Sequence, residues 1–422
     1  MRKITIVLGL GVSGIAAAEF LLQGQRFVLG IDGNRSLLRG SDEVRRLQGL
    51  GLFVQDESEM IDWSQVDQLV VSPGVSPKHP IYAGAQANGV SIVGEAELAL
   101  RHICRPLVAV TGTNGKTTVT LLVEHILNSA GIKCKALGNV GTPLCESVIR
   151  PGDEEVFVVE LSSYQLETMT TPVFEAAALL NITPDHLDRY ADMQEYAKAK
   201  CRLQHLLKKG GIFYVQDEVA RAFGHLLTAE NRELFSTLEN ERSTLQGHER
   251  ENAVAAWALC TPFSITREQF WAAFETFKKP PHRIEFVGEI DGVYFYDDSK
   301  GTNIDAVIQA AKSMTAPVIL IAGGVDKGAS YLPWREHFSG KVKQIIAIGQ
   351  AAEKIYEELH LYFNIKLADS LSLAVDVAIA SAERGDAVLL SPGCSSFDMF
   401  RDYAHRGEEF QHCIHTYRRS RS

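Results

Sequence analysis

Near the middle of the chain, an apolar segment runs directly into Thr111-Gly112-Thr113-Asn114-Gly115-Lys116-Thr117-Thr118. The apolar segment, Leu107–Val110, reads as a buried strand, and Val119–Ala130 after the turn reads as a helix. A glycine-rich turn between a strand and a helix directs several backbone N–H groups toward one point. The helix N-terminus and Lys116 add positive charge there. This combination suits a triphosphate, and it places the Thr117 hydroxyl where it can bind Mg²⁺.

The loop is a shorter variant of the common phosphate-binding pattern, because Gly-x-x-x-x-Gly-Lys would require glycine where Val110 stands. The alternative is an ordinary glycine-rich turn that carries a surface lysine. The strand before the loop and the helix after it argue against that alternative, because phosphate loops connect these two elements.

The N-terminal block has a second glycine-rich turn, Gly9–Gly14, in the pattern Gly-x-Gly-x-x-Gly. It lies between an expected strand, Ile4–Leu8, and an expected helix, Val12–Leu22. A second strand, Phe27–Ile31, ends at Asp32, which completes the dinucleotide-binding fingerprint. One hypothesis is therefore an NAD-dependent oxidoreductase. The same turn can equally hold the diphosphate of a UDP-linked ligand, and the second phosphate loop, which a simple dehydrogenase does not need, favours UDP.

Three further residues follow the phosphate loop and are candidates for its chemistry. Glu160 ends the apolar strand Val156–Val159, and His186 lies just past another apolar stretch, Ala176–Leu180. Ligands gather at the carboxyl ends of strands in open α/β sheets, where a carboxylate can hold Mg²⁺. For Glu160 a solvated or capping role stays open, and for His186 a structural one. Lys200 reads as a solvated lysine on a helix surface.

The last block follows Lys278-Lys279-Pro280-Pro281, an expected hinge. Its expected strands are Val293–Tyr296, Val318–Ile321, Gln344–Ile348 and Ala387–Leu390. Polar loops follow three of them: Asp297–Asn303, Gly323–Lys327 and Ser391–Asp398. Any one loop reads best as turn chemistry. Three such loops in one block indicate a shared site.

Length and composition fit a soluble α/β protein. A chain of 422 residues predicts two or three domains, and alternating strands and helices predict parallel sheets. The net charge of −10 argues against a nucleic-acid partner. The seven cysteines form no Cys-x-x-Cys pair, which predicts reduced thiols and a cytoplasmic protein. Residues 217–247 are weakly patterned and receive no assignment.

The N-terminus and the hydropathy pattern bear on export and membrane insertion. Arg2 and Lys3 precede an apolar stretch, but Gly9–Gly14 interrupts it, so a strand turning into a helix is preferred over a signal peptide. No apolar run is long enough to span a bilayer.

Taken together, these segments resemble the muramyl ligase family over essentially the whole chain. The segments that carry the resemblance, in the expected order, are Gly112–Thr118, Glu160, His186, Lys200 and Asp298–Asn303. Within the family the chain is most similar to the members that add D-glutamate. The segments on which that rests are Gly9–Gly14, Ser72–Gly74, Glu160–Glu167, Asp185–Tyr190, Asp298–Asn303 and Ser391–Phe400.

The resemblance implies three domains: a Rossmann-like UDP-precursor domain over 1–94, a central P-loop-type ATPase over 95–280, and a Rossmann-like C-terminal domain over 281–422. It implies ATP-dependent joining of D-glutamate to UDP-N-acetylmuramoyl-L-alanine through an acyl phosphate, for peptidoglycan synthesis. ATP and two Mg²⁺ ions are the expected cofactors. The two substrates are the expected partners of a monomer without nucleic-acid binding or membrane insertion.

The resemblance also implies roles for individual residues, with Lys116, Glu160, His186 and Lys200 as the catalytic set. ATP would contact Gly112, Thr113, Asn114, Gly115, Lys116, Thr117, Thr118, Asn252, Arg283 and Asp298. The UDP precursor would contact Val12, Ser13, Asp32, Arg35, Gly74, Asn139, Ser162 and Gln165. D-glutamate would contact Thr302, Lys327, Ser396, Phe397 and Tyr403. Thr117 and Glu160 would bind one metal ion, and His186 and a carbamylated Lys200 the second.

One segment departs from the family pattern. His248-Glu249-Arg250-Glu251-Asn252 has Glu249 where the family often has asparagine, so Asn252 is carried over and Glu249 is left out.

Two readings without D-glutamate addition stay open. A folylpolyglutamate-type ligase gives no reason for Gly9–Gly14, and a non-catalytic nucleotide switch gives none for the three polar loops.

Overall fold

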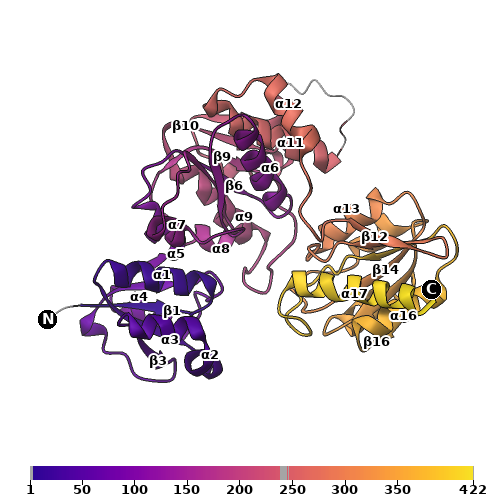
Figure 1. Cartoon of the computed structure of the whole chain (residues 1–422), viewed down its shortest axis with the longest axis horizontal. Helices are drawn as coiled ribbons and strands as arrows, with labels where there is room; N and C mark the ends of the chain where they lie inside the picture. Colours follow the sequence, from indigo (N-terminus) through magenta and orange to yellow (C-terminus); the bar gives the residue numbers. More distant parts are fainter. Residues whose placement is uncertain (1–2, 238–244, 246, 422) are drawn as a thin grey trace. The chain divides into compact units, whose positions relative to one another are not determined.

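The computed structural model describes residues 3–237, 245 and 247–421. The chain forms two compact units: Met1–Ile182 with Gln194–Phe277, and Thr183–Met193 with Lys278–Ser422. The first unit contains two β-sheets and the second contains one, each with helices against it (Figure 1). The predicted α/β class with parallel sheets is confirmed.

The N-terminal sheet has five parallel strands in the order β3-β2-β1-β4-β5. Its strands are β1 (Ile4–Leu8), β2 (Phe27–Asp32), β3 (Phe53–Asp56), β4 (Val66–Val71) and β5 (Ser91–Gly94). Its helices are α1 (Val12–Gln23), α2 (Arg35–Gly40), α3 (Asp42–Gly49), α4 (Pro80–Ala87) and α5 (Glu95–Leu100). Successive strands are added to one side of β1 as β2 and β3 and to the other side as β4 and β5, so β1 and β4 flank the point where a Rossmann-type sheet binds its ligand.

The central sheet has six parallel strands in the order β11-β10-β9-β6-β8-β7. They are β6 (Leu107–Thr111), β7 (Cys134–Gly138), β8 (Val156–Glu160), β9 (Phe174–Leu179), β10 (Leu207–Val215) and β11 (Arg232–Leu234). The helices are α6 (Lys116–Ser129), α7 (Leu144–Ile149), α8 (Ser163–Leu166), α9 (Met193–Cys201), α10 (Asp217–Phe223), α11 (Gly247–Cys260) and α12 (Arg267–Thr276). Because β6 lies between β8 and β9, residues that follow these three strands meet at one sheet edge.

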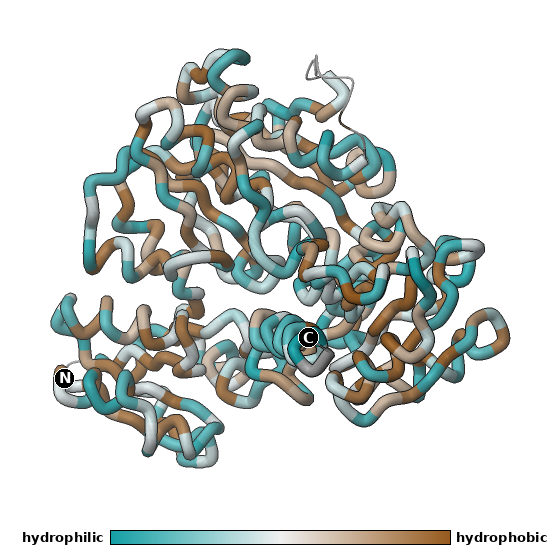
Figure 2. Tube along the Cα trace, turned by 45° about the vertical axis from the view of Figure 1, so that its right-hand side comes forward, coloured by the Kyte–Doolittle hydropathy of each residue, from teal (hydrophilic) through white to brown (hydrophobic). Residues whose placement is uncertain are grey.

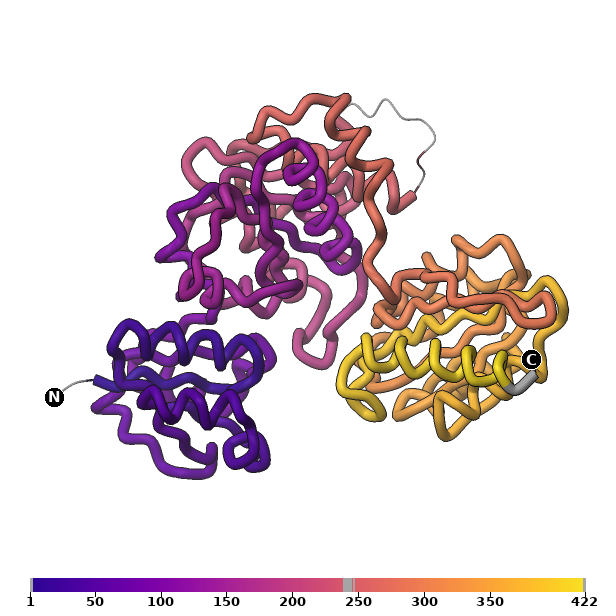
Figure 3. Tube along the Cα trace, viewed as in Figure 1, coloured from indigo at the N-terminus to yellow at the C-terminus, as the bar shows by residue number. Residues whose placement is uncertain are grey.

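The C-terminal sheet has the order β12-β13-β17-β14-β15-β16, with only β12 antiparallel to its neighbour among the described strands. The strands are β12 (Glu285–Ile290), β13 (Val293–Asp297), β14 (Val318–Gly323), β15 (Val342–Ile348), β16 (Asn364–Ala368) and β17 (Ala387–Leu390). One face is covered by α13 (Ile304–Ser313), α14 (Pro333–Phe338) and α15 (Ala352–Leu359). The other is covered by α16 (Leu371–Ser381) and α17 (Tyr403–Arg421), which Figure 3 shows beside each other.

The inner parallel strands are largely apolar because helices bury both faces of each sheet. β6 and β14 are entirely buried. Figure 2 shows hydrophobic residues in brown along the inner strands and hydrophilic residues in teal on many outer helices and loops. The central strands could therefore be located from the sequence, including β1, for which a signal peptide was the alternative interpretation.

Several elements were not predicted. They include β3, β5, β7, β10, β11, β12 and β16, and α6 begins at Lys116 rather than Val119. The unassigned residues 217–247 contain α10 and β11, while 238–244 and 246 lie outside the described residues. All seven cysteines are free thiols. Within the described part of the chain, no helix is both long and apolar enough to cross a membrane.

Candidate active site

The phosphate loop leaves β6 and enters α6 as the sequence predicts. Gly115 has a left-handed backbone with φ of 83°, and a Cβ atom there would lie 2.6 Å from the side-chain oxygen of Asn252. Glycine is therefore required both by the backbone conformation and by the approach of Asn252 from α11. Lys116 folds back over the loop and donates to the carbonyl oxygens of Gly112 at 2.8 Å and Thr113 at 2.7 Å.

Asn181, two residues beyond the end of β9, holds the loop in shape. Its side-chain oxygen accepts from the Asn114 amide at 2.7 Å, and its side-chain nitrogen donates to the Asn114 carbonyl at 3.1 Å. Its own carbonyl accepts from the Thr113 amide at 2.9 Å. Asn181 was not predicted to have a role in this site. Its position immediately after an apolar strand was the signal that could have identified it.

Lys200 is buried against the phosphate loop, so its reading as a solvated helix-surface lysine was wrong. The residue is 2% exposed, and its ammonium donates to the Gly112 carbonyl at 2.7 Å. The same ammonium lies 4.7 Å from the centre of the Tyr196 ring. The Tyr196 hydroxyl in turn is 3.1 Å from the Thr113 hydroxyl, so α9 is fastened to the loop at two points. Tyr196 was also missed from the sequence.

Glu160 ends β8, next to the strand that carries the loop. Its carboxylate is buried, and Asn139 donates to its Oε1 at 2.7 Å while its Oε2 has no hydrogen-bond partner. A buried unpaired carboxylate oxygen is costly unless something positive meets it. This orphaned oxygen, with the Thr117 hydroxyl in the first turn of α6, fits a divalent cation.

The N-terminal candidates gather at the carboxyl edge of β1 and its neighbours. Asp32 accepts from the Leu10 amide at 2.7 Å and so closes the glycine turn, while Ser72 donates to the Gly9 carbonyl at 2.7 Å. A Cβ atom on Gly14 would lie 1.8 Å from the Gly9 carbonyl oxygen, which explains the last glycine of the pattern. Ser72 leads into Gly74, so that residue follows β4 at the same edge.

The other UDP-site candidates differ in exposure and in the contacts that their side chains already make with neighbouring residues. Val12 and Arg35 are exposed at the starts of α1 and α2, and Arg35 pairs with Asp56 at 2.6 Å. Ser13 lies in the first turn of α1. Ser162 and Gln165 form a reciprocal capping box that starts α8. Their side chains therefore have a structural task in addition to any contact with substrate.

The three polar loops of the C-terminal block follow β13, β17 and β14, which are neighbours in the sheet. Ser391 donates to the Asp298 carboxylate at 2.7 Å, and the Gly393 amide donates to the Gly301 carbonyl at 2.8 Å. Val325 and Ser395 pair through two backbone hydrogen bonds. The loops thus form one connected surface, as the shared-site prediction requires.

Arg406 on α17 anchors these loops from beneath and was not anticipated from the sequence. It is fully buried and donates to the Ser299 side chain and carbonyl, both at 2.9 Å, and to the Cys394 carbonyl at 3.2 Å. Ser299 donates in turn to the Tyr403 carbonyl at 2.8 Å. Burial lowers the pKa of Arg406 to about 10, so the guanidinium stays charged at neutral pH. Nothing local marks this arginine, because its partners lie far away in the sequence.

Lys327 and Thr302, two of the D-glutamate candidates, lie close together. The Lys327 ammonium is 3.5 Å from the Thr302 hydroxyl and pairs with the Asp185 carboxylate at 3.0 Å. Asp185 also accepts from the amide of His186, whose backbone is left-handed with φ of 57°. Segment Thr183–Met193 thus belongs with the C-terminal unit. Of the remaining candidates, Ser396 is buried, and Phe397 is exposed.

Asp298, the acidic nucleotide candidate, is buried after β13. Burial raises the pKa of its carboxyl to about 7, against the Ser391 hydrogen bond and the nearby Arg283 charge, which both lower it. The turn that carries Arg283 is constrained by left-handed residues on both sides, His282 with φ of 60° and Ile284 with φ of 51°. Such backbone is maintained only where surrounding contacts enforce it.

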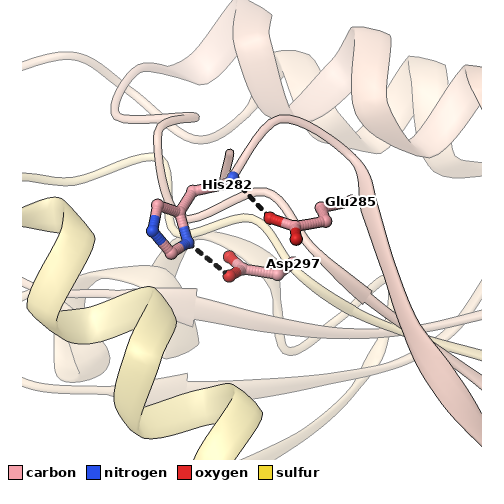
Figure 4. A group of neighbouring side chains, drawn as sticks. All are labelled: His282, Glu285 and Asp297. Atoms are coloured by element: carbon pink, nitrogen blue, oxygen red, sulfur yellow. Dashed lines mark hydrogen bonds and ion pairs between the residues drawn. The ribbon is translucent and has the colours of Figure 1, made fainter. Parts of the chain in front are cut away.

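Those contacts are shown in Figure 4. The His282 ring is 2.6 Å from the Asp297 carboxylate, and its amide donates to Glu285 at 2.8 Å. The hydrogen bond to Asp297 raises the pKa of His282 against the effect of its burial. These three side chains are close enough to hold a metal ion. The short His282–Asp297 separation, however, is that of a hydrogen bond. We therefore interpret the group as one that stabilises the turn carrying Arg283.

Glu249, the departure from the family pattern, is exposed on the first turn of α11. Its neighbour Glu251 is 3.1 Å from His248 and accepts from Gln216 at 3.3 Å. Asn252, the residue of this segment predicted to contact ATP, faces Gly115 of the phosphate loop.

Family comparison identifies the class of protein. Residues 3–94 match the MurD-like N-terminal domain of Mur ligases, 110–260 the Mur ligase middle domain, and 282–394 the Mur ligase glutamate ligase domain. The chain therefore belongs to the Mur ligase family.

Several similar curated proteins carry the name UDP-N-acetylmuramoylalanine--D-glutamate ligase. The protein of that name from Protochlamydia amoebophila (strain UWE25) is 47% identical, with 98% of each chain covered. The one from Caldicellulosiruptor bescii is 36% identical, with 98% of this chain and 97% of that protein covered. Neither an oxidoreductase nor a folylpolyglutamate ligase is favoured by these relatives.

Solved structures agree in fold. UDP-N-acetylmuramate-alanine ligase from Thermotoga maritima superposes with a TM-score of 0.60 at 17% identity, with both chains fully covered. The MurF ligase of the same organism, in complex with ADP, also gives 0.60 at 16% identity, covering 94% of this chain and 96% of that one.

Proposed function

We propose that the chain is an ATP-dependent ligase that joins D-glutamate to UDP-N-acetylmuramoyl-L-alanine in peptidoglycan synthesis. The full-length similarity to ligases of that name supports the substrate pair. The observation that carries the ATP-dependent step is the convergence on one sheet edge of Lys116, Lys200 and a buried, half-unpaired Glu160. A metal ion held by Glu160 and the ammonium of Lys116 would supply the charge neutralisation that transfer of a phosphoryl group requires.

In the proposed reaction an oxygen of the alanyl carboxylate attacks the γ-phosphorus of ATP, and ADP leaves. The amine of D-glutamate then attacks the acyl carbon, the bond to the phosphate breaks, and inorganic phosphate leaves. Lys116 and the loop amides from Gly112 to Thr118 bind the phosphates and neutralise their charge. His186 is assigned the proton that the amine gives up.

Two Mg²⁺ ions are part of the proposal, one held by Thr117 and Glu160 and one by His186 and Lys200. When bound, Mg²⁺ neutralises phosphate charge. Asn139 fixes one Glu160 oxygen and leaves the other for the ion. An ammonium cannot bind a metal ion, so the second site requires Lys200 as a carbamate, which supplies anionic oxygens.

The remaining assignments follow the sheet edges. The UDP precursor is assigned to Val12, Ser13, Asp32, Arg35 and Gly74 in the N-terminal block, and to Asn139, Ser162 and Gln165 in the central one. The nucleotide is assigned to Asn252, Arg283 and Asp298, and D-glutamate to Thr302, Lys327, Ser396, Phe397 and Tyr403. We place the domain limits at 1–94, 95–280 and 281–422, so that each contains one sheet. A cytoplasmic monomer completes the proposal.

The deciding experiment is ATP-dependent phosphate release with UDP-N-acetylmuramoyl-L-alanine and a panel of amino acids. D-Glutamate alone should support turnover with Mg²⁺. Equal turnover with L-glutamate or D-aspartate would remove the specificity. No phosphate release with any precursor, together with saturable binding of NADH seen by its fluorescence, would favour the oxidoreductase reading instead.

A further inference from the structure

Asp326 directly precedes Lys327, the lysine assigned to D-glutamate. The Asp326 carboxylate is held by two neighbouring side chains. Its carboxylate pairs with Lys354 on α15 at 2.8 Å and accepts from the Tyr331 hydroxyl at 3.2 Å. Lys354 also donates to the Ala329 carbonyl at 2.9 Å. One lysine therefore neutralises the acid and fixes the backbone two residues beyond Lys327.

Tyr331 joins this loop to the loop after β17. It is buried, and its hydroxyl lies 3.0 Å from the Cys394 sulfur, two residues before Ser396. Burial raises the pKa of Tyr331 above its usual range, so the hydroxyl keeps its proton and can donate. The Val325–Ser395 pairing runs beside this contact. Lys327 and Ser396 thus sit on two loops tied together at two places.

A third anchor comes from the same helix. Glu358, one turn beyond Lys354 on α15, accepts from the Tyr331 amide at 2.6 Å and from the Ser330 hydroxyl at 2.8 Å. α15 therefore holds Asp326 through a cation and Tyr331 through an anion. None of these side chains has a task in the reaction proposed above.

We propose that Tyr331 and Lys354 are positioning residues for the acidic amino-acid substrate. They fix the distance between Lys327 and Ser396, and Lys354 cancels the Asp326 charge, which would otherwise repel a dicarboxylate at a neighbouring lysine. The proposal rests on the proposed function, because it takes D-glutamate as the ligand of these loops. It adds residues that touch neither substrate nor the reacting atoms.

The test is steady-state kinetics of the full chain with each substrate varied in turn. Tyr331→Phe and Lys354→Met should each raise the KM for D-glutamate about three- to tenfold, the range for loss of one hydrogen bond or ion pair. The kcat and the KM values for ATP and the UDP precursor should stay near wild type. Tyr362→Phe and Lys366→Met, exposed residues of the same domain, are the matched controls.

A charge test separates positioning from simple loss of structure. If the uncompensated Asp326 charge is the cause, Asp326→Asn combined with Lys354→Met should recover most of the D-glutamate affinity that Lys354→Met loses, and Lys354→Arg should lose little. An unchanged KM in both single variants overturns the proposal. Parallel changes in kcat and all three KM values also overturn it, since they signal a general defect.

A second readout keeps the outcome clear if D-glutamate proves not to be the substrate. Cys394 is fully buried beneath Tyr331, and burial raises the pKa of its thiol to about 11, so a maleimide should label it slowly. Tyr331→Phe should speed labelling of the Cys394 peptide, measured by mass spectrometry, relative to Tyr362→Phe. Wild-type protein without D-glutamate turnover contradicts the proposed function, whereas unchanged Cys394 labelling contradicts the link between the loops.

Discussion

The ammonium groups of Lys116 and Lys200 donate to the same acceptor, the carbonyl oxygen of Gly112, at 2.8 and 2.7 Å. Two like charges that share one buried acceptor repel each other, and the low local dielectric strengthens that repulsion. Conversion of Lys200 to a carbamate would replace the repulsion with an attraction and give Lys116 an anionic neighbour. The pair therefore offers a physical reason for the proposed modification that does not depend on a metal ion.

Lys200→Ala should abolish ADP formation, and short carboxylates such as acetate or formate should restore part of it if a carbamate is the working group. Their anionic oxygens would take the place that the shortened side chain leaves. Lys198→Ala, an exposed lysine on the same helix, is the control and should behave as wild type with or without added carboxylate. If no added carboxylate restores turnover, the result would contradict the carbamate and favour the ammonium as the functional form of Lys200.

Glu160→Gln should lower kcat by roughly 100-fold or more, which is typical for loss of a group that stabilises transition-state charge. It should also raise the Mg²⁺ concentration needed for half-maximal rate, because a neutral carboxamide replaces the carboxylate and removes its negative charge. Glu155→Gln, an exposed residue just before the same strand, is the matched control. A normal Mg²⁺ dependence in Glu160→Gln would remove the assignment of that residue to the ion.

How far the sequence predicts this fold depends on how local the signal is. β6, β8 and β14 were located because strands buried on both faces are continuous apolar runs. β16 and β3 were not, since they lie at sheet edges and keep exposed or half-exposed positions. The phosphate loop was recognisable for the same local reason, because its glycines, lysine and flanking elements are contiguous.

The parts of the site that could not be predicted are those set by tertiary contact. Lys200 has the sequence context of a surface lysine, and its burial depends on Gly112, 88 positions away. Arg406 and Ser299 are 107 positions apart, and Tyr331 and Cys394 are 63. Helical periodicity cannot tell which polar residue of a helix faces a loop from another part of the fold. The family resemblance named Lys200 but supplied no reason for its burial.

Lys327→Met should raise the KM for D-glutamate at least tenfold, the change expected when a charge-assisted hydrogen bond to a substrate carboxylate is lost. ATP and UDP-precursor KM values should change little. Lys312→Met, an exposed lysine in the last turn of α13, serves as control. The Asp185 partner adds a stability effect, because the substitution removes one member of a mostly buried ion pair. Thermal unfolding of both variants should therefore accompany the kinetics, and equal KM values for D-glutamate at intact stability would contradict the assignment.

Glu95 gives the chain a pH-dependent cost in stability. Its carboxylate is buried, accepts from the Cys145 amide at 2.6 Å and so caps α7, which begins after Pro143 without a local side-chain cap. Burial raises the pKa of this carboxyl to about 7. Between the ordinary glutamate pKa and that value, the unfolded chain releases the proton and the folded chain keeps it. Stability contributed by the neutral group is therefore full at acidic pH and is lost progressively as pH rises toward 7.

Glu95→Gln should remove that dependence, because the amide keeps an acceptor for Cys145 and carries no charge. Relative to wild type, the variant should gain stability between about pH 5 and pH 8, by up to about 3 kcal/mol, since each pKa unit is worth roughly 1.4 kcal/mol. Urea unfolding of both proteins at several pH values measures this difference. Glu155→Gln, an exposed residue of the same unit, should leave the pH profile unchanged. A stability difference between Glu95→Gln and wild type that stays constant from pH 5 to pH 8 would show that Glu95 is already ionised in the folded protein.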